Sequence, residues 1–369
     1  MHAVVSSARL GHAASANVHA SSRRRPRMHA RAVRASSSSS SSSSAGSNST
    51  AGGTDLPKRE WSEMTTNEFE RLDKDRVIAL LPVGATEQHG PHLPVCVDAA
   101  INAGVLKRAM ELLPAEIPLT KLPPLPFGKS VEHDDFAGTI SLGTNTLMAA
   151  WTDIGESVRR AGVKKLVLFN SHGGQPQVAE IVSRDLRKRL GMLVVTVDWF
   201  SFGLPEGMFD DDELRHGLHG GDVETSVMLH LHPDLVDMSK ADDFRSAGRD
   251  MEQSGDFNLL TPEGGIGFGW LAQDLNPSGA TGNASKATAE KGKACVEHAA
   301  AKLVELFLEI DDFDVDCVFR GGESGEYCTT NYRRIWPGRE DAGIGASGGA
   351  TENAPESKYK SHYTGTRSS

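Results

Sequence analysis

Residues 77–98 of the sequence read VIALLPVGATEQHGPHLPVCVD, and this stretch indicates both a fold and a site. It begins with an apolar run, residues 77–83, that has the length of a buried strand and ends at a glycine. Beyond the glycine, an extended backbone would place Glu87 and His89 on one side, because side chains alternate along a strand. Together with Asp98 they make three potential metal ligands beyond the carboxyl end of a strand, where open α/β sheets bind ligands.

Each of these side chains also has an ordinary structural explanation. A single Glu or His after a strand is commonly a solvated loop residue. Asp98 precedes a helical pattern over residues 98–113, and Asp is a favoured N-cap residue. The presence of all three within twelve positions is what favours a metal site.

The composition is that of a globular protein with an acidic body. The 369 residues, 38% hydrophobic and 24% charged, suffice for one large domain or two small ones. No apolar run approaches the roughly 20 residues that span a bilayer, so we expect no membrane partner. Residues 55–369 carry a formal charge of −17, which disfavours nucleic acid as a partner. The four cysteines show no paired spacing, which indicates free thiols.

The two ends of the chain differ from its centre. Residues 1–54 hold seven arginines, no Asp or Glu, and nine consecutive serines. Such an N-terminus is typical of an organellar transit peptide followed by a Ser-rich linker, although a disordered basic tail is the alternative. We expect import into the chloroplast (plastid stroma), with the mitochondrion as the alternative. Residues 320–369 are rich in Gly and Ser and are predicted to be a disordered tail, which leaves 55–319 as the folded domain.

The pattern of elements in the centre predicts an α/β fold. Apolar runs at 77–83, 164–170 and 193–200 are predicted strands, and helical patterns separate them. This alternation predicts a three-layer domain with a largely parallel sheet flanked by helices. The expected helices span residues 98–113, 147–161, 176–190, 222–232 and 286–310, after a short capped helix that begins at Thr65 or Thr66. Residues 130–142 are expected to form a loop and a short strand, and 240–285 show few periodic signals.

The stretch FNSHGGQ, residues 169–175, is the second candidate site element. It continues directly from the predicted strand at 164–170. His172 would therefore lie at the same sheet edge as Glu87 if the two strands are parallel neighbours. The two glycines after the histidine permit a tight turn and a close approach of the backbone to a ligand. The alternative is a histidine that only caps or solvates the turn.

The stretch HGLHGGDVETS, residues 216–226, is the third candidate. Asp222 and Glu224 open a predicted helix, and the helix dipole alone would favour acidic residues there. His219, before two glycines, has no such structural explanation. The sequence contains neither a phosphate-binding loop nor a G-x-S-x-G elbow, so a nucleotide-binding α/β protein is not favoured.

These motifs together resemble the creatininase (creatinine amidohydrolase) family. The likeness covers residues 65 to 310 in one register and rests on PVGATEQHGPHLPVCVD, FNSHGGQ, HGGDVETS and SKATAEKG. It implies an α/β domain with two divalent metal ions per subunit, hydrolysis of non-peptide or cyclic amide C–N bonds, and commonly a homohexamer. Carboxylate and imidazole ligands suit Zn²⁺, Mn²⁺ or Fe²⁺, and the sequence does not choose between them.

By motif position, the resemblance also implies roles for individual residues. The metal ligands would be Glu87, His89, Asp98, His172 and Glu224. Asp98 would bridge the two ions, and Glu224 would serve the second ion or the catalytic water. His219 would protonate the leaving nitrogen after attack by a metal-activated water, a role that suits the ordinary pKa of imidazole. The expected substrate-binding residues are Ser130, Gly173 and Gly174.

The sequence departs from creatininase proper after the strand-end histidine. Creatininase places Tyr-Glu there, the glutamate being a metal ligand, whereas this chain has Gly173 and Gly174. The wider branch, with its formamide hydrolases and a peptide-maturing peptidase, fits better, so creatinine is not the expected substrate. We expect a metal-dependent amidohydrolase that cleaves a small cyclic amide or formamide as a homo-oligomer. The alternative is a catalytically silent family member retained for binding or assembly.

Overall fold

The computed structural model describes residues 56–257, 259–262 and 266–316. The predicted transit peptide and the predicted C-terminal tail lie outside the described residues. The helices are α1 (Thr66–Arg71), α2 (Val97–Leu112), α3 (Thr144–Arg160), α4 (Pro176–Leu190), α5 (Asp211–His216), α6 (Asp222–Leu231), α7 (Ala247–Ser254), α8 (Ala272–Leu275) and α9 (Ala289–Asp312). The strands are β1 (Ile78–Val83), β2 (Leu119–Lys121), β3 (Lys165–Asn170), β4 (Leu193–Asp198), β5 (Asp243–Phe244) and β6 (Gly282–Asn283).

Four strands form a parallel sheet in the order β2-β1-β3-β4. Strand β1 lies beside β3 along its whole length, and their last residues, Val83 and Asn170, are paired. The loops that follow these two strands therefore begin side by side at one edge of the sheet. The predicted α/β fold with a largely parallel sheet is confirmed.

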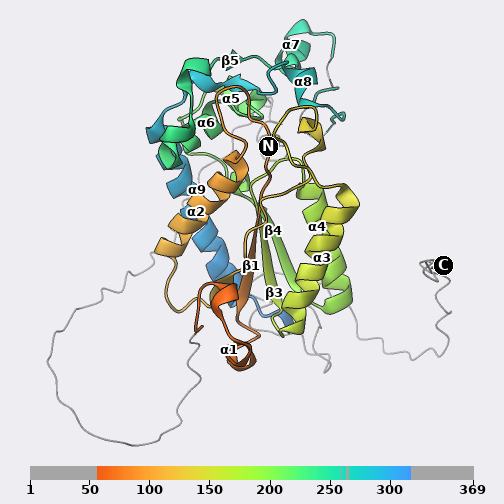
Figure 1. The fold of residues 1–369 in the computed structure, drawn as a ribbon, viewed down its shortest axis with the longest axis vertical. Helices are drawn as coiled ribbons and strands as arrows, with labels where there is room; N and C mark the ends of the chain where they lie inside the picture. The colour runs from red at the N-terminus through yellow and green to blue at the C-terminus, as the bar shows by residue number, and fades with distance from the viewer. Residues whose placement is uncertain (1–55, 258, 263–265, 317–369) are drawn as a thin grey trace, which may run out of the picture. The chain divides into compact units, whose positions relative to one another are not determined.

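Helices cover both faces of this sheet and make the fold three-layered. Figure 1 shows α2 and α9 on one face, and α3 and α4 on the other. Side chains of β1 alternate between the two faces, as the period of a strand requires. Ile78 and Leu80 pack in the core with α2 and α9, whereas Ala79 and Leu81 pack with α3 and α4. Burial of apolar surface on both sides holds the strand ends in place.

The N-terminal ends of α1 and α2 test two predictions about capping residues. A capping box formed by Thr65 and Glu68 begins α1, as expected. The alternative explanation of Asp98 as an N-cap is wrong, because Cys96 is the N-cap of α2. Asp98 lies instead inside the first turn and is 2% exposed. A buried carboxylate that caps nothing calls for another partner.

Two segments differ from the prediction. Residues 130–142 form a 3-10 helix (Val131–His133) in place of the expected strand, and only an isolated bridge joins Ile140 to Thr86. Residues 240–285 contain β5, α7, α8 and β6, which are too short to give a clear periodic signal. Among the described residues, no helix has the length and apolar character needed to cross a membrane.

Candidate active site

A cavity of about 360 Å³ opens beyond the carboxyl ends of β1 and β3. Three parts of the chain line it. The loops after the strands and the start of α2 contribute Glu87, Asp98, Ser171, His172, Gly173 and Gly174. The 3-10 helix and the start of α6, with the residues next to them, contribute Lys129, Glu132, His133, His219 and Glu224. A third wall includes Phe268, Gly269 and Trp270.

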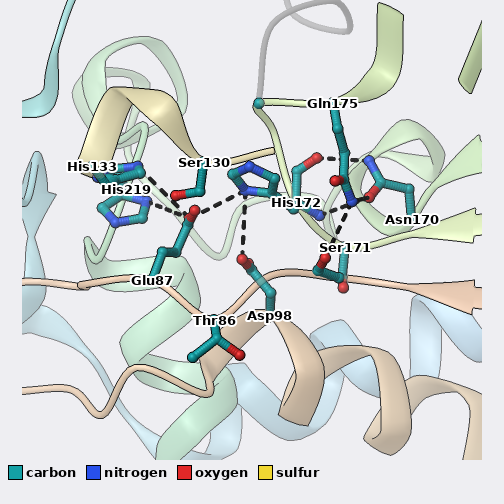
Figure 2. Close-up of polar contacts among 12 residues, drawn as sticks. Thr86, Glu87, Asp98, Ser130, His133, Asn170, Ser171, His172, Gln175 and His219 are labelled. Carbon is teal, nitrogen blue, oxygen red and sulfur yellow. Dashed lines mark hydrogen bonds and ion pairs between the residues drawn. The ribbon is translucent and has the colours of Figure 1, made fainter. Parts of the chain in front are cut away.

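Two groups of three side chains lie at this cavity, each close enough to hold one cation. One group is Glu87, Asp98 and His172, the other is His89, Asp98 and Glu224, and the ligand atoms of each lie within 4.8 Å of one another. Asp98 belongs to both groups. Figure 2 shows Asp98 facing the ring of His172. The Oδ2 of Asp98 lies 3.5 Å from His172 Nδ1, and its Oδ1 lies 3.8 Å from His89 Nε2. The structure thus brings all five predicted ligands together, with Asp98 where a bridging carboxylate would lie.

Backbone carbonyls orient the two histidines toward these carboxylates. His172 donates its Nε2–H to the carbonyl of Lys129 at 2.8 Å, and His89 donates its Nδ1–H to the carbonyl of Glu87 at 3.1 Å. The other nitrogen of each ring faces the carboxylates and would carry the lone pair with a cation bound. His172 Nδ1 lies 3.1 Å from Glu87 Oε1, and His89 Nε2 lies 3.7 Å from Glu224 Oε2. Hydrogen bonds of this kind fix the tautomer of metal-binding histidines.

The cluster leaves buried polar atoms without hydrogen-bond partners. These atoms are Glu87 Oε2, His89 Nε2 and Asp98 Oδ2. Such atoms cost free energy unless a ligand satisfies them. Tetrahedral zinc, with bonds of about 2.0–2.1 Å, holds its ligand atoms about 3.3 Å apart. The four nitrogen–oxygen distances of the cluster, 3.1, 3.5, 3.7 and 3.8 Å, are close to that value, so the residues fit two divalent cations.

The electrostatics of the cluster are consistent with a cation site. Burial, followed by repulsion from Glu87 and Glu224, raises the pKa of Asp98 well above its ordinary value. Burial, the largest single effect, opposes ionisation of Glu87, but His172, through attraction and a hydrogen bond, together with His133 and His219 outweighs it and lowers the pKa of Glu87. Burial, with His219 nearby, lowers the pKa of His89 to about 4, which keeps this imidazole neutral. A bound cation would favour the ionised carboxylates and a neutral imidazole ligand.

His219 faces the same carboxylates from the wall of the cavity. Its Nε2–H donates to the carbonyl of Gln88 at 2.5 Å, so its lone pair lies on Nδ1, which is 3.8 Å from Glu87 Oε1. His219 also forms a third group of possible ligands with Glu87 and His89. Glu224, besides approaching His89, accepts the backbone N–H of Gly220 at 2.6 Å. The structure therefore places both predicted catalytic residues at the cavity.

The three predicted substrate-binding residues are placed differently. Gly173 and Gly174 line the cavity, whereas Ser130 is completely buried and does not. At Gly174, an added Cβ would lie 1.8 Å from Glu132 Oε1 and 2.6 Å from His172 Nε2. Gly174 stands where creatininase proper has a glutamate. Because it has no side chain, the carboxylate of Glu132, from another part of the chain, occupies that space.

Asn170 fixes the loop that carries His172. Its Nδ2 donates to the carbonyl of His172 at 2.6 Å, and its Oδ1 accepts the backbone N–H of His172 at 3.1 Å. The same Oδ1 accepts a bond from Gln175 Nε2 at 2.8 Å, and Figure 2 shows these groups beside Ser171. The asparagine and glutamine of FNSHGGQ therefore shape the turn that holds a predicted ligand.

Sequence reasoning missed Glu132 and His133. Both line the cavity, and His133 Nε2 lies 3.7 Å from Glu87 Oε1. The ring of His133 stacks on that of His219 with centroids 4.1 Å apart. Burial, with His219 nearby, lowers the pKa of His133 to about 2. The adjacent Glu and His in SVEHDDF were the available signal, but no predicted strand leads into them.

Comparison with known proteins identifies relatives of this chain. The creatininase family model, described as creatinine amidohydrolase, matches residues 62–307. A mycofactocin precursor peptide peptidase from Mycolicibacterium smegmatis is 33% identical over 177 residues, which are 47% of this chain and 66% of that protein. The chain thus spans just under two thirds of that peptidase. A creatinine amidohydrolase from Pseudomonas putida is 34% identical over 198 residues, which are 49% of this chain and 75% of that protein.

Solved structures show the same likeness. A creatininase variant complexed with creatine superposes with a TM-score of 0.53 at 28% identity, covering 68% of this chain and 98% of that one. A manganese creatininase and a Zn–Zn creatininase variant superpose with TM-scores of 0.54 and 0.53, at 27% and 28% identity. Each covers 68% of this chain, and the chain covers 98% and 96% of them respectively.

Proposed function

The chain belongs to the creatininase family, and from this premise we propose that it is a metal-dependent amidohydrolase that cleaves a C–N bond of a small cyclic amide or formamide. The observation that carries the proposal is that Asp98 is shared between two groups of possible ligands at one cavity. The orphaned atoms of those groups and the manganese and zinc forms of the related creatininases support two divalent ions, with Zn²⁺, Mn²⁺ or Fe²⁺ as candidates.

The protein's own residues supply the proton transfers. Two divalent ions, when bound, polarise an amide carbonyl and lower the pKa of a water molecule. His219 can accept a proton at Nδ1 as the water attacks the carbonyl carbon, and can return it to the leaving nitrogen. Glu87, 3.8 Å from that nitrogen atom of the ring, stabilises the positive charge while His219 holds the proton. The bond to the Gln88 carbonyl keeps the ring in position throughout.

The cavity restricts the size and character of the substrate. Its volume of about 360 Å³ lies at the lower end of the range for small-molecule sites. Phe200, Phe268 and Trp270 offer apolar surface, while Lys129 and Glu132 offer charge. A small amide with an apolar portion and at least one further polar group matches this lining.

Metal analysis of the full chain, purified without chelator, tests the proposal. We expect about two divalent ions per chain in the wild type and fewer in His172→Ala. His232→Ala, at an exposed histidine outside the cavity, is the matched control and should keep both ions.

The same preparations should then be screened for turnover of formamides, cyclic amides and, because one relative is a peptidase, short peptides. Activity lost in His172→Ala and retained in His232→Ala would support the proposal. A wild-type chain that binds no metal and cleaves none of these substrates would instead favour the binding or assembly alternative.

We further propose that residues 1–54 direct import into the chloroplast and that the enzyme works as a homo-oligomer. The acid-free, Arg- and Ser-rich composition supports the first proposal, and the family resemblance supports the second. Import assays with the full chain and with a chain lacking residues 1–54 distinguish chloroplast from mitochondrial uptake. Light scattering of the purified protein gives the oligomeric mass, and a monomer would contradict the second proposal.

A further inference from the structure

Two backbone groups fix the orientation of the buried Gln88 side chain. Its Oε1 accepts the N–H of Gly90 at 2.8 Å, and its Nε2 donates to the carbonyl of Gly279 at 2.8 Å. A backbone N–H only donates and a backbone carbonyl only accepts, so these two bonds decide which end of the amide is oxygen and which is nitrogen. Gln88 is buried, which together with the two bonds holds its side chain in this orientation.

This orientation decides the tautomer of His133. Gln88 Nε2 lies 2.7 Å from His133 Nδ1, and the second amide hydrogen points to the ring once the first is used by Gly279. Because Nδ1 accepts this bond, the neutral ring carries its proton on Nε2. A second proton on Nδ1 would face a donor, so the imidazolium form is disfavoured by geometry as well.

We propose that His133 is a fixed hydrogen-bond donor that presents its Nε2–H to the carbonyl oxygen of the substrate amide. The ring lines the cavity, and its Nε2 is 3.7 Å from Glu87 Oε1, longer than a hydrogen bond. Its neighbour His219 presents a lone pair to the same cavity, so the two stacked rings divide the work: one donates a hydrogen bond and the other carries the proton. This inference rests on the proposed hydrolase function and adds a group that stabilises charge on the reacting oxygen.

Two substitutions of His133 distinguish loss of the hydrogen-bond donor from loss of the ring. His133→Gln keeps an N–H donor near the position of Nε2, whereas His133→Leu keeps bulk without a donor. With metal content at the wild-type level, we expect kcat to fall about 100-fold in His133→Leu, and His133→Gln to recover most of it. KM should change less than kcat. An equal loss of kcat in both variants, or a loss confined to KM, would overturn the proposal.

The tautomer itself is measurable without any turnover. Nitrogen-15 spectra of histidine-labelled protein distinguish protonated from unprotonated ring nitrogens, and His133→Gln identifies the signals of His133 by their loss. We expect the wild type to carry the proton on Nε2. Gln88→Glu should move it to Nδ1, because a carboxylate accepts where the amide donates. A proton on Nδ1 in the wild type would overturn the proposal.

Formate, the product of formamide cleavage, provides a probe of substrate contact in the zinc-loaded protein. Its carboxylate oxygen should accept the Nε2–H bond and shift that resonance of His133, with no shift in Gln88→Glu. A wild type that shows this shift but cleaves no amide would contradict the hydrolase function and leave the donor role supported. A wild type that cleaves amides without the shift would contradict the donor role alone.

Discussion

The two halves of the site differ in how the chain builds them. The strand-borne half consists of Glu87, His89, Asp98 and His172, which lie just beyond β1 and β3 or in the first turn of α2. The loop-borne half consists of Glu132, His133, His219, Phe268 and Trp270, which come from short or irregular segments. Glu224, in the first turn of α6, faces the strand-borne half from the other side.

The two halves also differ in part in their burial. The side chains of the strand-borne half are 0–3% exposed, and backbone carbonyls fix its histidines. In the loop-borne half, the side chain of His133 is equally buried at 3%, but those of His219 and Glu132 are 11% and 14% exposed. Cation binding requires ligands that are fixed before the ion arrives, whereas a substrate must enter and leave. We infer that the first half holds the metal ions, whereas the second half contacts the substrate and, through His133 and His219, takes part in the chemistry.

The largest effect is expected at the residue that both groups of ligands share. Asp98→Ala should reduce the metal content from about two ions per chain to near zero. It should lower kcat/KM at least about 1000-fold, because bound ions supply several kcal/mol of transition-state stabilisation. Asp234→Ala, at an exposed aspartate, is the control and should leave both quantities unchanged. Retention of both ions in Asp98→Ala would contradict the sharing that the geometry indicates.

A smaller loss is expected where the two halves touch. Gly174→Ala would place a methyl group 1.8 Å from Glu132 Oε1 and 2.6 Å from His172 Nε2, so one of these side chains must move. Displacement of a site residue by about 1 Å costs roughly 100-fold in rate, and we expect kcat to fall by that order. Gly269→Ala is the matched control, because it lines the same cavity and its added Cβ would meet nothing within 4 Å. Equal kinetics in the two variants would show that the contact between the halves is dispensable.

At the apolar wall of the loop-borne half, the effect should fall on substrate binding. Trp270→Ala removes apolar surface from the cavity wall, and Trp270 is not itself one of the possible metal ligands. Loss of such a contact is worth about 1–3 kcal/mol, so we expect KM to rise roughly tenfold or more with unchanged metal content. Steady-state kinetics with metal analysis on the same sample checks both. A drop in bound metal would show that the division of labour between the halves is wrong.

The sequence predicted the strand-borne half because local signals mark it. Strands β1 and β3 are apolar runs whose ends are visible to within a residue or two, and parallel pairing then brings Glu87 and His172 to one edge. The helix over residues 98–113 was equally visible, although the buried place of Asp98 within it was not.

The loop-borne half has no such signals. His133 lies on a helix of three residues, which is too short to show a period, and reaches Gln88 across 45 positions of sequence. Trp270 lies in the region of short elements between residues 240 and 285. Glu132 occupies the space left by Gly174 only because two distant loops pack together. Such contacts depend on tertiary packing, which periodicity does not report.

The smallest expected effect concerns an ionisable contact next to the segment that carries His219, because β6 directly follows Thr281, which pairs with His219. Glu213 on α5 accepts backbone N–H groups of Asn283 at 2.8 Å and Val223 at 3.4 Å, and so joins β6 to the first turn of α6. Burial raises the pKa of Glu213 to about 7, although the bond from Asn283 opposes the shift. The strand-borne half is held by backbone carbonyls that do not titrate, so the two halves should respond differently to pH.

The raised pKa fixes the sign of that response. Between pH 4.5, the ordinary pKa of the group, and about pH 7, the folded protein keeps a proton on Glu213 that the unfolded chain has released. The stabilisation is therefore complete below the lower value and is lost as the pH rises through the upper one. Glu213→Gln has no proton to lose at this position. Its free energy of unfolding should therefore fall less than that of the wild type as the pH rises across this window, by on the order of 2 kcal/mol. Urea unfolding at pH 5 and pH 7.5 measures the difference, with the exposed Glu206→Gln as control. If the free energy of unfolding falls equally with pH in the wild type and in Glu213→Gln, titration of Glu213 does not control the stability of this region.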